Sequence, residues 1–271
     1  MATASVTKSE MGRPTVATHR VERSLPAILG AVVVPAVLLG LWEMAGRFNL
    51  VDVRFVPTPS AILGAMIRLM SSGELPASGL KTLLRVGQGY AIGAGLGVVL
   101  GLAYGLWAPL RRFGGTLVEL ARPIPGVTLI PLTILWFGLG EAAKVSIVSW
   151  AVFFPVFLNA VLGFRSIPPI LVQAARVTEI RGWRLFWKVL LPAAIPAIFT
   201  GLRLSIGYAL MSTAAVEMIL GPDGLGAEII DAQRTFRIPE MFAAIVAFAG
   251  LGAMSAIGLL QVERLLLSYR R

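Results

Sequence analysis

Six long apolar stretches constrain the fold of this chain more than any other feature of its sequence. A helix that crosses the apolar core of a bilayer needs about 20 mostly apolar residues. We therefore expect an all-α integral membrane protein in which residues 25–271 form one transmembrane domain. The six transmembrane helices are expected at about 26–46, 86–107, 116–139, 144–164, 192–220 and 241–260.

The shortage of charged residues favours a membrane protein over a soluble one. Only 14% of the residues are charged and 56% are apolar, whereas soluble domains average about 25% charged and about 45–50% apolar residues. A water-soluble fold of this composition would expose large apolar patches and aggregate. The chain has no cysteine, three aspartates and one histidine, His19. It therefore has almost no material for a metal site or a His-dependent triad, and we expect no metal and no cofactor.

Residues that bend helices or bring them close together occur at regular places. Glycines 89, 93, 97 and 101 share one face of the second expected span, which lets a neighbouring helix pack closely. Three prolines fall in the third span, at positions 123, 125 and 131. Because lipid cannot satisfy the backbone groups that proline leaves unbonded, we expect a broken helix facing the bundle interior. Residues 57–85 are amphipathic and predict an interfacial or packed-elbow helix.

The distribution of basic residues predicts the orientation of the chain. Residues 1–24 are polar and are expected to form a disordered cytoplasmic tail. With this tail inside, the inner segments carry 14 Lys and Arg residues and the outer segments carry 8. The positive-inside rule then places both termini in the cytoplasm. This rule also accounts for the net charge of +10, which in a soluble protein would suggest nucleic acid.

The segment 165–191, RSIPPILVQAARVTEIRGWRLFWKVLL, is the most informative loop. It is too polar to enter the bilayer, yet its apolar residues recur at helical spacing. The small residues Ala174 and Ala175 would let a partner surface approach closely, and Arg181-Gly182 offers a turn. Apolar residues further along, Trp183 and Phe186 among them, are placed to hold the loop against the membrane-embedded part.

This loop resembles the EAA signature of ABC importer permeases, E-A-A-x3-G-x9-I-x-L-P. The matching positions are Gln173, Ala174, Ala175, Glu179, Val189, Leu191 and Pro192. Gln173 replaces the signature's glutamate and Glu179 replaces its glycine, so Gly182 is expected to supply the bend between two short helices. Further segments resemble permeases of the nitrate/sulfonate/taurine type in the expected order: 120–144, 153–169, 191–210 and 214–233.

The resemblance implies a MetI-like permease core in the bacterial inner membrane. It implies a dimer of two identical permease copies, two cytoplasmic ABC ATPase subunits and an external substrate-binding protein, periplasmic or lipid-anchored. Residues 170–182 would then be a coupling helix that docks on the ATPase. The chain itself lacks the G-x4-GK[ST] phosphate loop, so we expect it not to be an enzyme.

Ionisable residues inside expected spans are candidates for the translocation pathway, because burying a charge in hydrocarbon is costly. Arg122 and Arg203 could each contact a passing oxyanion. Alternatives stay open: Arg122 could pair with Glu217, and Arg203 could extend to the cytoplasmic interface. Asn159 is a further pathway candidate, although an interhelical hydrogen bond is the simpler role for it. Glu217 is itself a pathway candidate, and Glu119 and, more weakly, Glu43 also qualify as intramembrane charges.

Two other classes of protein must be weighed against the permease. An ion-coupled secondary transporter usually shows an inverted repeat, and no clear one is visible here. A membrane-embedded, metal-dependent lipid transferase needs clustered aspartates or histidines, which this chain lacks. The substrate stays open among nitrate, taurine, alkanesulfonates, aromatic acids and thiamine precursors, since an external binding protein does most of the selecting in such systems.

Overall fold

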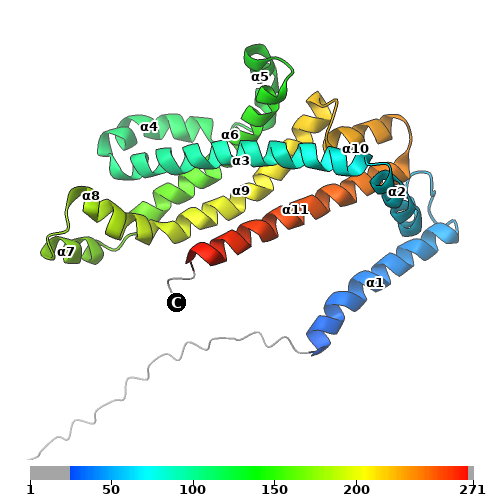
Figure 1. Cartoon of the computed structure of the whole chain (residues 1–271), viewed down its shortest axis with the longest axis horizontal. Helices are drawn as coiled ribbons and strands as arrows, with labels where there is room; N and C mark the ends of the chain where they lie inside the picture. Colours follow the sequence, from blue (N-terminus) through cyan, green and yellow to red (C-terminus); the bar gives the residue numbers. More distant parts are fainter. Residues whose placement is uncertain (1–24, 268–271) are drawn as a thin grey trace, which may run out of the picture.

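The computed structural model describes residues 25–267, with side chains described for 33–265 except that of Arg176. The expected disordered tail, residues 1–24, lies outside the described residues. All regular elements in the described range are helical (Figure 1). They are α1 (Leu25–Arg47), α2 (Pro59–Ser71), α3 (Glu74–Leu106), α4 (Ala108–Ala121), η1 (Gly126–Leu129), α5 (Ile130–Phe137), α6 (Glu141–Arg165), α7 (Pro169–Val177), α8 (Gly182–Leu185), η2 (Phe186–Leu190), α9 (Leu191–Leu220), α10 (Leu225–Arg234) and α11 (Ile238–Leu267).

Three long helices, α3, α6 and α9, form the centre of the bundle. A core of small and β-branched side chains joins them, including Val86, Val152 and Ala209. The glycine face predicted on α3 packs on α6: a Cβ at Gly97 would lie 2.9 Å from the carbonyl oxygen of Phe153. A Cβ at Gly89, Gly93 or Gly101 would also collide with α6. The predicted close helix packing is therefore confirmed.

The remaining helices lie around this centre. α11 runs alongside α9 and contacts α2 and α10 near its start (Figure 1). Ile62 and Ala65 of α2 are buried against Ala243 of α11, as expected for a packed elbow helix between the first two spans. α1 contacts the bundle through α2 and through Trp42, whose ring lies 6.3 Å from that of Phe242.

The described residues contain four helices that are long and apolar enough to cross a membrane, starting at Glu74, Glu141, Gly182 and Ile238. A bent helix pair, 108–121 with 126–137, raises the number to five if it counts as one span. The break expected in the third span, 116–139, is confirmed, because the two helices of the pair meet at 90°. Pro123 and Pro125 cause this break, because proline lacks the N–H that an α-helix requires.

Two further expectations about elements need correction. The second span begins at Glu74 rather than at about residue 86. Lys81 and Arg85 can lie inside the helix because both pair with carboxylates. Residues 108–115, expected as an inner loop, are the start of α4. This helix has no buried residue, so within this chain it does not face the bundle interior.

The chain has two distinct ends. Arg85, near the start of α3, pairs with Glu141, the first residue of α6. Both helices therefore begin at the same end, and α4, η1 and α5 return the chain between them. α10 and α2 also lie at this end, whereas α7 and α8 lie at the opposite one (Figure 1).

Candidate functional site

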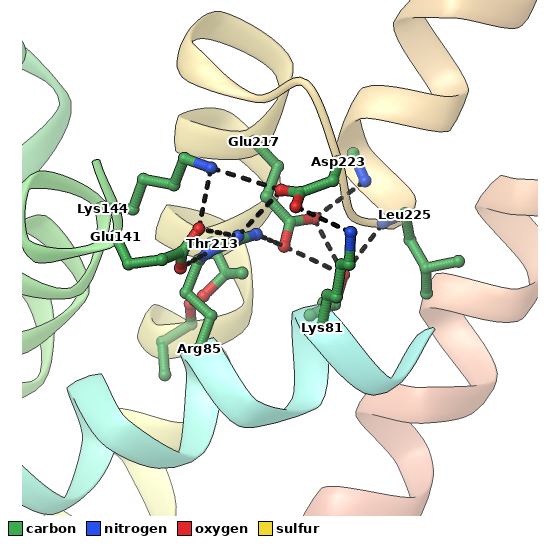
Figure 2. A network of polar contacts seen from close by, with 11 residues as sticks. Lys81, Arg85, Glu141, Lys144, Thr213, Glu217, Asp223 and Leu225 are labelled. Carbon is green, nitrogen blue, oxygen red and sulfur yellow. Dashed lines mark hydrogen bonds and ion pairs between the residues drawn. The ribbon is translucent and has the colours of Figure 1, made fainter. Parts of the chain in front are cut away.

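An ion-pair network lies at the end of the bundle where α3 and α6 begin (Figure 2). Its centre is Arg85, whose side chain is 2% exposed. The Arg85 guanidinium donates to Glu217 of α9, to Glu141 of α6 at 2.6 Å and to Asp223 at 3.1 Å. One buried cation therefore connects three helices and the loop that follows α9.

Two lysines complete the network. Lys144 of α6, also 2% exposed, donates to Glu141 at 3.0 Å and to Asp223 at 3.3 Å. Lys81 of α3 donates to Asp223 at 2.9 Å. The three cations thus face three carboxylates, and a buried group of ions is tolerable when each charge is paired and hydrogen-bonded.

The network also fixes the loop at 221–226. Glu217, fully buried, accepts hydrogen bonds from the Thr82 hydroxyl and from the backbone N–H of Gly226, each at 2.9 Å. The Thr82 oxygen in turn accepts the N–H of Leu225 at 2.9 Å. The start of α10 is therefore held to α3 and α9 by side chains that are themselves buried.

Asp223 is the loop member of the network. Partial burial acts to raise the pKa of this carboxyl, but the hydrogen bond from Lys81, the charge of Lys144 and the bond from Arg85 outweigh it and lower the pKa to about 2. Asp223 therefore stays ionised at any physiological pH. Its charge can therefore serve as a permanent anchor for Lys81, Lys144 and Arg85.

The loop 165–191 at the opposite end forms a short helix, α7, and a turn. The Ile180 N–H bonds the Ala175 carbonyl at 2.9 Å, the six-to-one bond of a Schellman helix end. Glu179 occupies the position where such an end favours glycine and has φ of +57°. Gly182 also has a positive φ, +58°, so the turn uses two left-handed residues, one of which is not glycine.

The signature positions of this loop differ in exposure. Gln173 and Ala174 are exposed on α7, whereas Ala175 is only 6% exposed. Leu191 and Pro192 begin α9, after the π-helical turn η2 that contains Val189. Because α8, η2 and α9 continue into one another, a single helical rod of 39 residues runs from Gly182 to Leu220.

Aromatic residues attach the loop to the bundle only in part. Phe186 stacks on Phe164 of α6, with ring centroids 6.2 Å apart. Trp183 and Trp187 contact Phe186 but remain 72% and 52% exposed. Together with Ile170 and Val177, which are 67% and 84% exposed, they give this end of the molecule an exposed apolar surface.

A cavity of about 460 Å³ opens between the 122–127 break, α6 and α9. Two of the predicted pathway residues, Arg122 and Asn159, line it. The Trp150 indole N–H donates to the Ile124 carbonyl at 3.1 Å and so holds the break against α6. The Asn159 amide donates to the Pro155 carbonyl at 2.8 Å, a bond within α6 rather than between helices.

The other predicted pathway residues lie elsewhere. Glu217 pairs with Arg85 and not with Arg122, because α3 and α9 meet at the end of the bundle where both residues lie. Arg203 is exposed and pairs with Glu263 of α11. Glu119 is exposed on α4. Glu43 pairs with Arg47 and accepts a hydrogen bond from the Ser60 hydroxyl.

Five charged members of the network were not predicted as functional residues: Lys81, Arg85, Glu141, Lys144 and Asp223. Each lies at or near an expected span boundary, where a charge looks like an ordinary loop residue. The available signal was their number: two cations at 81 and 85, and a Glu-x-x-Lys pair at 141 and 144, border spans that otherwise carry almost no charge.

Comparison of the sequence with known proteins finds similarity to transport proteins. A family model described as "Binding-protein-dependent transport system inner membrane component" matches residues 93–265. A protein of Bacillus subtilis (strain 168), whose name assigns it to aliphatic sulfonates transport as a permease, is 33% identical over 239 residues, 88% of this chain and 87% of its own.

The names of two further relatives give different substrates. The taurine transport system permease protein of Escherichia coli (strain K12) is 29% identical over 234 residues, 84% of this chain and 85% of its own. The riboflavin transport system permease protein of Chloroflexus aurantiacus is 32% identical over 223 residues, 82% of each chain.

Proposed function

The chain belongs to the family of binding-protein-dependent transport system inner membrane components, which are ABC transporter permeases, and from that premise we propose that it conducts a small anionic solute into the cell. The family consists of transport components rather than enzymes. Such permeases work with an ATPase and a substrate-binding protein. We propose that ATP is hydrolysed by the separate cytoplasmic subunits and that two copies of this chain form the pore.

The coupling mechanism is proposed for the end that carries α7. The observation that carries it is the exposure of Gln173 and Ala174 on a short helix that stands outside the bundle. An exposed helix with small residues and neighbouring apolar side chains is suited to a groove on a partner protein. Movement of such a partner would act on α8 and η2 and reach α9 directly, because these helices are continuous.

The proposed topology has six spans with both termini in the cytoplasm. α1 and the bent pair α4 with η1–α5 would supply the two spans that extend the four long helices to six. The loop 165–191 and the C-terminal end of α11 lie at the same end (Figure 1), which would be cytoplasmic. The ion-pair network would then lie at the outer end.

The anionic substrate is proposed from the cavity and from the relatives. Arg122 and Asn159 line the cavity and remain our pathway candidates. Glu217 and Arg203, which have ion-pair partners inside the chain, are proposed to stabilise the helix packing around the pathway instead.

The decisive experiment replaces Ala174 by tryptophan in the permease–ATPase complex and measures ATP-driven uptake into proteoliposomes. Ala174 is exposed, so the new ring would leave the chain's own packing intact and obstruct the docking surface. We expect uptake to be lost. Ala175 is a poorer site for this test, because it is buried and a large residue there would disturb the fold.

The matched control is Met254→Trp, which adds a ring at a position of α11 that is 73% exposed. We expect this variant to assemble and transport like the parent. Normal uptake by Ala174→Trp in an assembled complex would contradict the coupling proposal. Uptake by the permease alone on an ion gradient would instead favour a secondary transporter.

A further inference from the structure

The cavity beside the 122–127 break has the size and the lining of a ligand-binding site. Its lining comes from one face each of two helices: Leu204, Tyr208 and Ser212 recur every four residues on α9, and side chains at that spacing share one helix face. α6 contributes Trp150, Phe154 and Leu158 at the same spacing. At about 460 Å³ the cavity falls within the range of small-molecule sites, about 300–1,000 Å³.

The charge of this cavity has one sign only. Arg122 is the single charged residue among those that line it, and no carboxylate is among them. Within the described part of the chain the Arg122 guanidinium has no ion-pair or hydrogen-bond partner. A guanidinium fork binds a carboxylate or sulfonate through two parallel hydrogen bonds, and here it is available to do so.

A second polar group in the cavity also lacks a partner. Ser212 is 8% exposed, and its hydroxyl makes no hydrogen bond to any residue that the structure describes. The hydroxyl oxygen lies against the accessible space of the cavity rather than in the packed core, so it is placed to donate a hydrogen bond to a polar group on an occupant.

Apart from Arg122, Asn159, Ser212 and the hydroxyl of Tyr208, the side chains that line the cavity are apolar or aromatic. Trp150, Phe154, Leu158 and Leu204 are among them, beside the ring of Tyr208. Aromatic and aliphatic surfaces gain free energy by covering a ligand's apolar body, and they give nothing to a small hydrated inorganic ion. The site therefore combines one anion-binding group with a pocket for hydrocarbon.

We propose that this cavity binds an organic anion with a sulfonate or carboxylate head and an uncharged aliphatic or aromatic tail. The head contacts Arg122 and the tail lies against Trp150 and Phe154. This inference refines the proposed function by defining its substrate class. Nitrate fails to fill the apolar part, and the ammonium group of taurine finds no carboxylate in the lining.

The test is equilibrium binding to the permease–ATPase complex in lipid nanodiscs without ATP, measured by calorimetry, with empty nanodiscs as the blank. The probes are naphthalene-2-sulfonate, naphthalene-2-carboxylate, nitrate and taurine. We expect the two naphthalene anions to bind at least about tenfold more tightly than nitrate or taurine, a difference of about 1.4 kcal/mol. The two naphthalene probes separate a sulfonate preference from a carboxylate preference.

Variants locate the binding. Arg122→Gln should weaken naphthalene-2-sulfonate binding about tenfold, because it removes a charge-assisted pair, and Ser212→Ala should weaken it about threefold. The matched control is Arg112→Gln: Arg112 is exposed on α4, the helix that Arg122 follows, but it does not line the cavity, and its loss should leave binding unchanged.

Equal binding by Arg122→Gln and Arg112→Gln, or equal binding of nitrate and naphthalene-2-sulfonate, would overturn the proposed site. The function itself is tested separately by uptake. If the complex binds the naphthalene anions as expected but never transports with ATP, the proposed function fails and the site stands. If transport proceeds while no probe binds above the blank, the site alone fails.

Discussion

At the scale of single residues, the backbone conformation of Glu179 is strained, and a substitution can remove this strain. Its φ of +57° lies in the left-handed region, which costs an L-residue roughly 1–2 kcal/mol and glycine almost nothing. We predict that Glu179→Gly raises the stability of the complex by about 1 kcal/mol, measured by thermal unfolding in nanodiscs. Gly182→Ala, at a position with nearly the same φ, should change stability in the opposite direction. A destabilised Glu179→Gly would show that the glutamate makes a compensating contact.

The Arg85–Glu217 pair is the second residue-scale prediction. Both side chains are almost completely buried. Glu217→Gln therefore removes the negative charge that neutralises the buried Arg85 guanidinium. Breaking such a pair costs about 3–5 kcal/mol, and we expect a loss of this order in chemical or thermal unfolding. Lys81→Gln removes a cation whose side chain is 54% exposed and should cost less than about 1 kcal/mol. Equal losses for the two variants would mean that burial does not determine the strength of this network.

At the scale of elements, the contact between α3 and α6 depends on which face a glycine occupies. A Cβ at Gly93 would collide with the Ser149 carbonyl oxygen, whereas one at Gly95 would meet nothing within 4 Å. We predict that Gly93→Ala destabilises the protein by about 1–3 kcal/mol through forced separation of the helices. Gly95→Ala should be neutral or slightly stabilising, because alanine favours helix. The comparison uses unfolding of both variants, and a similar effect would disprove tight packing on this face.

The elements also show what the sequence can and cannot predict. Hydropathy located the apolar helices, and the four-residue glycine spacing predicted the close face of α3, because both depend on residues near in sequence. The start of α3 was misplaced, since Arg85 lies inside the helix with carboxylate partners that are distant in sequence: Glu141, Glu217 and Asp223. The cavity shows the same limit: Arg122 and Asn159 were candidates by residue type, but Ser212 and Tyr208 join them only when α9 packs on α6.

At the scale of the whole molecule, one helical rod connects the two ends. The 39 residues from Gly182 to Leu220 span about 57 Å at 1.5 Å per residue. The exposed loop with α7 lies at one end of this rod, and the ion-pair network holds Glu217 at the other. Leu204, Tyr208 and Ser212, between them, line the cavity. Because the helix is continuous through its internal Pro196, α9 would carry a displacement of the loop past the cavity to the clamped outer end.

Gly207 offers a place to interrupt this rod. It lies within α9, and a Cβ there would meet nothing within 4 Å, so Gly207→Ala should assemble and transport normally. Gly207→Pro also places its Cβ in open space, but its ring meets the carbonyl of Arg203 and it removes a backbone hydrogen bond, so it kinks the helix. We predict that this complex still assembles and hydrolyses ATP within about twofold of the parent, while uptake into proteoliposomes falls at least about tenfold, because motion of the loop no longer reaches the outer half of α9. If uptake and hydrolysis fall together, the kink acts on the ATPase contact itself; if both persist, force passes between the ends by another route, and continuity of α9 is not what couples them.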